Sequence, residues 1–223
     1  MKKLFHPASW IGFATASAFA VAQRWSLQEF CWSIWVAGLI YSWVCVFTAV
    51  IKIVLTAQSS KKEYEKRLPA LKSVNPNIFS VGISLIAVPA GFIAFRLYSY
   101  LFGFYGLFLS VFAEMEPFSL FGRNGFINSD FYTPVIYLLI LFWPMVLGVL
   151  IAHIEDFFRK NTWRQAFLPF HSEIIRIHIF TVVLPFVTLI AWFLFGEAYQ
   201  QPTIVLLLGL FYLFPARRPL ASS

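Results

Sequence analysis

The stretch that decides the fold is Ile78–Ala113, IFSVGISLIAVPAGFIAFRLYSYLFGFYGLFLSVFA, in which Arg96 is the single charged residue. Its 36 residues would measure about 54 Å as a helix, whereas the hydrocarbon core of a bilayer is ~30 Å thick. We predict one long helix that crosses a membrane once and bends near Pro89–Ala90–Gly91. The remainder of the segment should lie in the outer interface or fold back into the membrane.

Composition points to lipid as the solvent of the whole chain. Of the 223 residues, 60% are hydrophobic and 12% are charged, whereas a soluble domain carries about 25% charged residues. The aromatic share of 20% suits lipid-facing and interfacial surfaces, and an aromatic lining for an apolar ligand stays open as a second interpretation. The net charge of +7 sits in a few short loops, so it indicates topology and not a nucleic-acid partner.

Charge sets the predicted topology. We predict an all-α, polytopic bundle of six transmembrane helices with no soluble domain. The six apolar segments are 7–23, 30–57, 78–113, 131–152, 171–195 and 203–215. The inner segments would hold twelve cations and the outer ones only Arg24 and Arg123, a strong positive-inside bias. We therefore expect both termini in the cytoplasm and a location in the plasma (inner) membrane, in contact with membrane lipids. The twelve inner cations are Lys2, Lys3, Lys61, Lys62, Lys66, Arg67, Lys72, Arg159, Lys160, Arg164, Arg217 and Arg218.

The first apolar segment has two interpretations. Gly12, Ala16 and Ala20 recur every four residues, so a neighbouring helix should approach that face closely. The same segment has Met1-Lys2-Lys3 before it and the small residues Ala20-Val21-Ala22 near its end, as a cleaved signal peptide would. We favour an uncleaved first helix.

Histidines and carboxylates gather near the fourth and fifth segments. His153 and Asp156 are three residues apart, and His171 and His178 are seven apart, which puts each pair on one helix face. The set has three interpretations: a metal or haem site, a proton relay, or interfacial polar residues that hydrogen-bond to helix ends and lipid phosphates. Arg176 lies beside this set.

Two further cations stand inside apolar segments. We expect Lys52, in the last turns of the second segment, to reach the interface with its ammonium group. We expect Arg96 to reach the outer headgroups, and a position near mid-membrane is the alternative. The prolines at 89, 144 and 185 are candidates for hinges or for lining a cavity. Since proline is common in membrane helices, we favour an ordinary packing role for them.

One resemblance to a known family exists. The stretch PFHSEIIRIH at 169–178, with a Trp-rich second segment holding Trp32, Trp35, Trp43 and Lys52, resembles a bacterial family of uncharacterised polytopic integral membrane proteins. The resemblance implies the helical architecture and no activity.

The sequence holds no Gly-rich phosphate loop, HExxH or GxSxG motif, so no enzyme class is indicated. The first functional hypothesis is an accessory or scaffold subunit of a membrane complex, or a binder of an apolar ligand, with a protein partner or a second copy. The alternatives are a metal- or haem-dependent membrane oxidoreductase that uses the histidines, and a small transporter.

Overall fold

The computed structural model describes residues 7–112, 132–154, 157, 172–196 and 200–213, and each element in these ranges is a helix. The all-helical prediction is therefore confirmed for this part of the chain. The elements are α1 (Pro7–Ala22), α2 (Leu27–Arg67), the 3₁₀ helix η1 (Pro69–Ser73), α3 (Pro76–Phe112), α4 (Tyr132–Leu141), α5 (Trp143–Ala152), α8 (Ser172–Phe195) and α9 (Gln200–Leu213).

Both ends of α2 follow from local chemistry. At its start the Glu29 backbone N–H donates to the Ser26 hydroxyl at 3.1 Å, and the Ser26 N–H donates to the Glu29 carboxylate at 2.7 Å. This capping box satisfies two backbone donors that the helix start would otherwise leave unpaired. The helix runs for 41 residues and ends at Arg67, because the next residue, Leu68, precedes Pro69 and is disfavoured in helical conformation. Residues 58–67 are thus its last turns, so the helix extends beyond the predicted end of the segment at residue 57.

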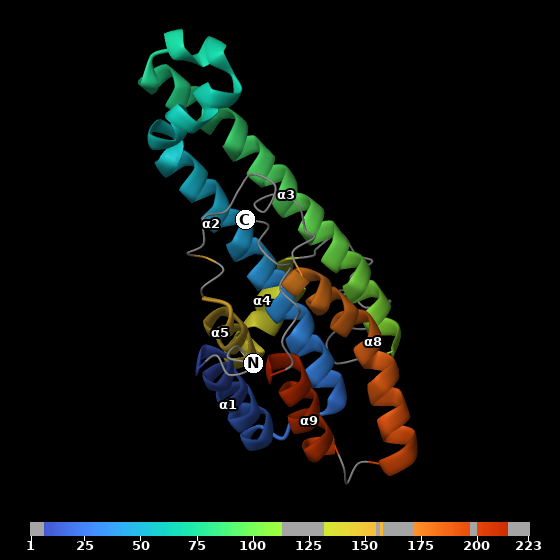
Figure 1. The fold of residues 1–223 in the computed structure, drawn as a ribbon. Coiled ribbons are helices and arrows are strands. Elements are labelled where there is room, and N and C mark those ends of the chain that lie inside the picture. The colour runs from blue at the N-terminus through green and yellow to red at the C-terminus, as the bar shows by residue number, and fades with distance from the viewer. Residues whose placement is uncertain (1–6, 113–131, 155–156, 158–171, 197–199, 214–223) are drawn as a thin grey trace.

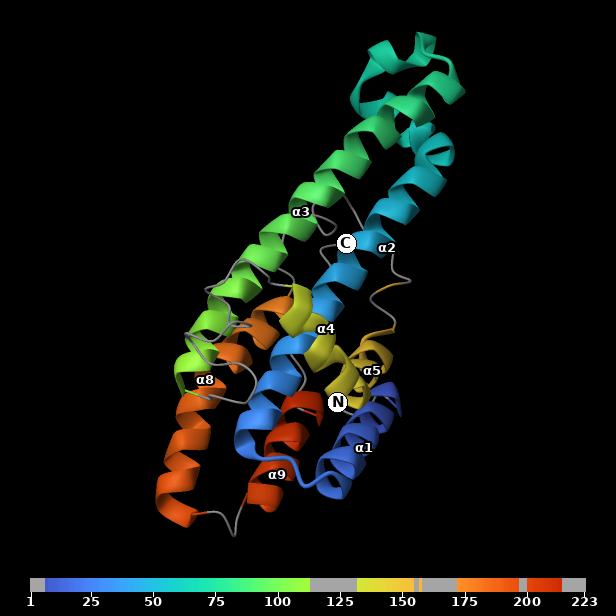
Figure 2. The ribbon, with the colours of Figure 1, turned by 180° about the vertical axis from the view of Figure 1, so that it is seen from behind.

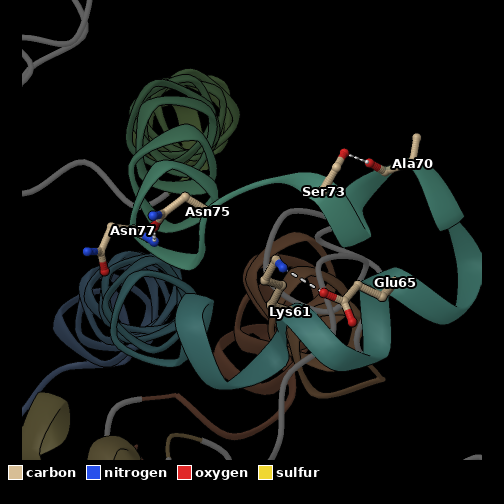
Figure 3. Close-up of polar contacts among 6 residues, drawn as sticks. All are labelled: Lys61, Glu65, Ala70, Ser73, Asn75 and Asn77. Atoms are coloured by element: carbon tan, nitrogen blue, oxygen red, sulfur yellow. Dashed lines mark hydrogen bonds and ion pairs between the residues drawn. The ribbon is translucent and has the colours of Figure 1, made fainter.

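The charged tip (residues 61–77) connects α2 to α3 through η1. Lys61 pairs with Glu65 at 2.6 Å, and Arg67 lies 3.9 Å from Glu63. Figure 3 shows that Asn75 closes the turn, with its side-chain oxygen accepting from the backbone N–H of Asn77 at 2.9 Å. An Asn cap followed by Pro76 is a favourable helix start, because the proline lacks the N–H that would remain unpaired there.

Helix α3 returns antiparallel to α2, and the two form a long hairpin (Figures 1 and 2). It continues through Pro89 to Phe112 without a break, so residues 97–112 do not fold back as a separate segment. The arms approach closely where Gly91 faces Val50, because a Cβ on Gly91 would overlap a methyl group of Val50. The far half of the hairpin has a small core of its own, made by Ala49, Ile53 and Ala87.

The main core surrounds the first half of α2. Trp32 and Trp35 have no exposed surface, and every residue from Phe30 to Leu39 is buried. Trp35 donates from its indole nitrogen to the Phe102 carbonyl at 2.9 Å, which ties the two arms together inside the bundle. Helices α1, α5, α8 and α9 gather at this end, and the charged tip extends away from them in both views.

Helices α1, α5 and α9 meet at a junction of two glycines and a tyrosine. A Cβ on Gly12 would lie 2.6 Å from the Gly148 carbonyl oxygen and 2.9 Å from the Tyr212 ring. The Tyr212 hydroxyl donates to the Met145 carbonyl at 3.5 Å. Small residues therefore let the backbones of α1 and α5 touch, and one aromatic ring from α9 covers the contact.

The fourth apolar segment is broken. Helices α4 and α5 are bent by 83° at Phe142. Pro144 accounts for the break, since it has no N–H to donate to the preceding turn and its ring crowds the carbonyl four residues earlier. Phe142 itself is fully buried and packs edge-on against Trp25 at 5.2 Å between ring centroids.

In the described part of the chain, α2 and α3 are long and apolar enough to cross a membrane, and α4–α5 is a third candidate if the bent pair is one span. Helices α1 and α9 are apolar but shorter. In α2, 56% of the most apolar stretch is buried inside the bundle, whereas in α3 only 22% of the corresponding stretch is buried. Helix α2 is thus the centre of the bundle, and α3 presents an apolar outer face.

Candidate functional site

The most distinctive polar cluster on the apolar surface is formed by Arg96, Tyr100 and Tyr132, here called the Arg96 cluster. The guanidinium donates from Nη2 to the Tyr100 hydroxyl at 3.0 Å and from Nη1 to the Tyr132 hydroxyl at 3.4 Å. Its carbon also lies 5.2 Å from the centre of the Tyr100 ring, a cation–π distance. Two phenols thus fix the orientation of an exposed cation.

The positions of these three residues have different origins. Tyr100 follows Arg96 by four residues on α3, a spacing that puts both side chains on one helix face. Tyr132 belongs to the start of α4 and reaches the cluster through the tertiary fold. Around the cluster the surface is apolar, with Phe92 65% and Leu97 62% exposed.

No carboxylate in the ranges that the structure describes pairs with Arg96. The carboxylates of Glu63 and Glu65 are bound to cations of the charged tip, and Glu29 caps the start of α2. The partners of the Arg96 guanidinium are neutral hydroxyls, so its positive charge is not compensated by an anion of the described residues.

A belt of amphipathic side chains lies at the height of Arg96 along the hairpin. The Trp43 indole nitrogen donates to the Ser99 hydroxyl at 3.2 Å, and its ring packs on Phe95 at 4.7 Å. Half a turn away, Tyr41 packs on the His153 ring at 5.0 Å. Tyr41 is buried inside the bundle, whereas Tyr100 and Tyr132 are exposed and Trp43 is partly exposed at the same height. Exposed tryptophans and tyrosines are typical of the headgroup level of a membrane protein.

The short helices end near this belt. His153 caps the end of α5, and its contact with Tyr41 places that end beside the middle of α2. A Cβ on Gly12, in the first half of α1, would lie 3.3 Å from Ala152 and 2.9 Å from Tyr212 of α9. The start of α1 and the ends of α5 and α9 thus gather at one level, which the α2–α3 hairpin passes on its way to the charged tip.

The predicted histidine–carboxylate set is only partly visible. His153 is buried, with 9% of its surface exposed. Asp156 and His171 lie outside the described residues, and His178 and Arg176 lie on α8 at positions whose side chains are not described. Among the residues that are described, no three His, Cys, Asp or Glu side chains come together as a metal site would need. The metal, haem and relay hypotheses stay predictions.

The other predicted residues lie in two places. Gly12, Ala16 and Ala20 are the buried residues of α1 and face its neighbours. Lys52 is half-buried on α2, beyond the belt on the side of the charged tip. Its backbone carbonyl accepts from the Thr56 hydroxyl at 2.7 Å.

Sequence reasoning identified Arg96 but missed its partners and the role of Tyr212. The i,i+4 spacing of Arg96 and Tyr100 was a usable signal. Nothing local indicates Tyr132, which is 36 residues away, or the packing of Tyr212 over Gly12 and Gly148.

The described residues define the class of the chain: an all-helical protein with helices long and apolar enough to span a membrane. Comparison with known proteins goes no further, since no protein family, curated protein or solved structure matches the chain. The resemblance to the bacterial membrane family therefore stays a prediction.

Proposed function

We propose that the chain is an accessory subunit of a membrane complex that binds a partner protein through the far half of the α2–α3 hairpin. In this proposal it spans the plasma (inner) membrane of a bacterium six times, with both termini and the charged tip in the cytoplasm. The observation that carries the proposal is the apolar face that the hairpin exposes beyond the level where the other helices end.

Chain direction supports six crossings. The side-chain amide of Gln201 donates to the Trp25 carbonyl at 2.8 Å, so the start of α9 lies at the end of the bundle opposite the belt. Helix α3 also runs from the tip toward that end. The chain must therefore return to the belt side before α4 begins, since Tyr132 at the start of α4 lies beside Arg96. Helix α4 then leads to Phe142 beside Trp25, and α5 comes back to the belt at His153, as a re-entrant pair would.

Helix length supports a membrane boundary at the belt. Helix α1 has 16 residues and α9 has 14, which correspond to about 24 and 21 Å. Lys3 precedes α1 by four residues, and Arg217 follows α9 by four. Since cations at these positions favour headgroups over hydrocarbon, the bilayer surface should pass close to the belt.

The hairpin continues well past this boundary. From Trp43 to the last apolar turn at Ala57, α2 adds roughly 20 Å. Over this length, apolar side chains of both arms point away from the seam of the hairpin: Phe47, Ile51, Leu55, Val81, Leu85 and Val88 are all more than half exposed. Many exposed apolar side chains on one part of a protein in water are typical of a protein interface.

The occupant that fits is an apolar surface of another polypeptide. Lipid covers only the hairpin half inside the bilayer, because the apolar length of α3 is about 50 Å and exceeds the ~30 Å of a hydrocarbon core even at the larger tilts of membrane helices. The exposed residues Val81, Leu85 and Val88 follow a three- and four-residue spacing, which is the pattern of a helix that packs against another helix.

Photocrosslinking from two positions of one helix tests the proposal. Leu85 and Phe104 are each 70% exposed on α3 and are roughly 28 Å apart. With a benzophenone amino acid at each position in native membranes, Leu85 should crosslink to a polypeptide, whereas Phe104 should crosslink to lipid alone. Leu85→Gln should also reduce recovery of the same partner in mild detergent, and the tip variant Lys72→Gln should leave it unchanged.

Two results would contradict the proposal. Lipid adducts alone from both positions would place the whole hairpin inside the bilayer. An adduct with twice the 25.6 kDa mass of the chain would identify a second copy as the occupant, and the protein would then be a homo-oligomer instead of an accessory subunit.

A further inference from the structure

We propose that the Arg96 cluster binds the phosphate of an anionic phospholipid at the cytoplasmic surface of the bilayer. The inference rests on the membrane placement of the proposed function, in which the belt marks the inner headgroups. It assigns to Arg96 a ligand, and a side of the membrane opposite to the outer one expected from the sequence.

Hydrogen-bond capacity is the first argument. A guanidinium has five N–H donors and no acceptor, and the described partners of Arg96 are the Tyr100 and Tyr132 oxygens. The Tyr100 hydroxyl accepts from Arg96, so its own O–H remains available as a donor. The cluster thus offers several N–H donors and an O–H, which is the complement of an anion with several oxygens.

Charge is the second argument. A cation on an apolar, lipid-facing surface is stable only beside an anion or in the headgroup layer. No carboxylate of the described residues supplies Arg96 with such an anion. The inner leaflet of a bilayer supplies anionic phosphates at this depth.

Surface shape is the third argument. Arg96, Tyr100 and Phe104 succeed one another at four-residue intervals and lie along one stripe of α3. Leu97, Phe104 and Val111 are 62%, 70% and 59% exposed, and they run from the cluster into the half of the hairpin that the bilayer covers. A lipid with its phosphate on Arg96 would lay an acyl chain along this stripe.

Lipid titration of the purified full chain in a neutral detergent tests the assignment. Short-chain phosphatidylglycerol and phosphatidylcholine with the same acyl chains are the probes, and bound lipid is counted by native mass spectrometry. The wild-type protein should bind phosphatidylglycerol about tenfold more tightly than Arg96→Gln does, which corresponds to about 1.4 kcal/mol. Phosphatidylcholine binding should be weak in both.

Matched variants separate this site from general surface charge. Arg67→Gln removes an exposed cation of the charged tip and should leave phosphatidylglycerol binding unchanged. Arg96→Lys keeps the charge without the planar fork, and Tyr100→Phe removes one oxygen from the cluster. Each should bind the lipid several-fold more weakly than the wild type, so the assignment remains testable if Arg96→Gln fails to fold.

Three outcomes would overturn the assignment. The first is equal phosphatidylglycerol binding by the wild type and the folded Arg96 variants. The second is a loss of phosphatidylglycerol binding in Arg67→Gln as large as the loss in Arg96→Gln. The third is displacement of the lipid by inorganic phosphate at comparable concentration. The last would indicate a soluble phosphate ligand. None of them bears on the Leu85 crosslink, so failure of this site is distinguishable from failure of the proposed function.

Discussion

The carbonyl oxygen of Gly148 lies 2.6 Å from the point that a Cβ on Gly12 would occupy. At this distance a methyl group meets backbone and not a flexible side chain, so α1 would have to move away from α5. The contact explains why two glycines stand opposite each other in helices, where glycine is otherwise unfavourable.

Gly12→Ala is therefore expected to destabilise the bundle by about 1–3 kcal/mol, the usual cost of overpacking. The measurement is the thermal midpoint in detergent. Gly82→Ala is the matched control, because a Cβ there has open space around it; this change should be neutral or stabilising by up to ~1 kcal/mol through helix propensity. Similar losses for both variants would disprove the close contact.

Gly91→Ala should open the hairpin, since the new methyl group would overlap the Val50 side chain. The second substitution Val50→Ala should restore most of the lost stability by making room for it. A double-mutant cycle in detergent checks this coupling. Additive losses would mean that Gly91 and Val50 do not touch.

Trp35→Phe should cost about 1–3 kcal/mol, because it leaves the buried Phe102 carbonyl without its indole donor. Unfolding by a denaturing detergent is the suitable assay. Trp192→Phe, at a site 54% exposed on α8, should change little. Equal stability of Trp35→Phe and the wild type would contradict the hydrogen bond.

Ser26→Ala removes the side-chain oxygen that caps α2 and should destabilise the chain by about 1 kcal/mol. Ser26→Asp keeps an acceptor and should retain most of the stability, while Glu29→Gln keeps the reciprocal bond of the box. Hydrogen exchange of the first turn of α2 provides a local readout. Exchange that is no faster in Ser26→Ala than in the wild type would speak against the capping box.

Local chemistry made several features predictable from the sequence. Long apolar runs indicated helices because a lipid-adapted chain makes its backbone hydrogen bonds within each helix. The start of α3 at Asn75-Pro76 and the end of α2 before Pro69 can also be recognised from the residue types. The extension of α2 beyond Ala57 was also encoded, since Lys61 and Glu65 are four residues apart, but a charged stretch was interpreted as a loop.

Tertiary features were not predictable. The direction of α5 depends on how the bend at Phe142 is accommodated by Trp25, and a proline inside an apolar run predicts neither the angle nor the partner. Arg96 was recognisable as a charged residue inside an apolar segment. Its depth in the membrane, however, depends on which part of the long helix α3 the short helices surround. The helices that decide this, α1 and α9, lie at opposite ends of the chain.

The position of Tyr212 has a consequence for the order of assembly. Helices α2 and α3 are neighbours in the chain and can pair as soon as α3 has left the ribosome. The ring that covers Gly12 and Gly148 comes from α9, so the junction of α1 and α5 stays uncovered on that side until α9 has been made. A nascent chain that stops before α9 should therefore hold a formed hairpin and an uncovered α1–α5 junction, and this is the intermediate that chaperones and proteases would meet.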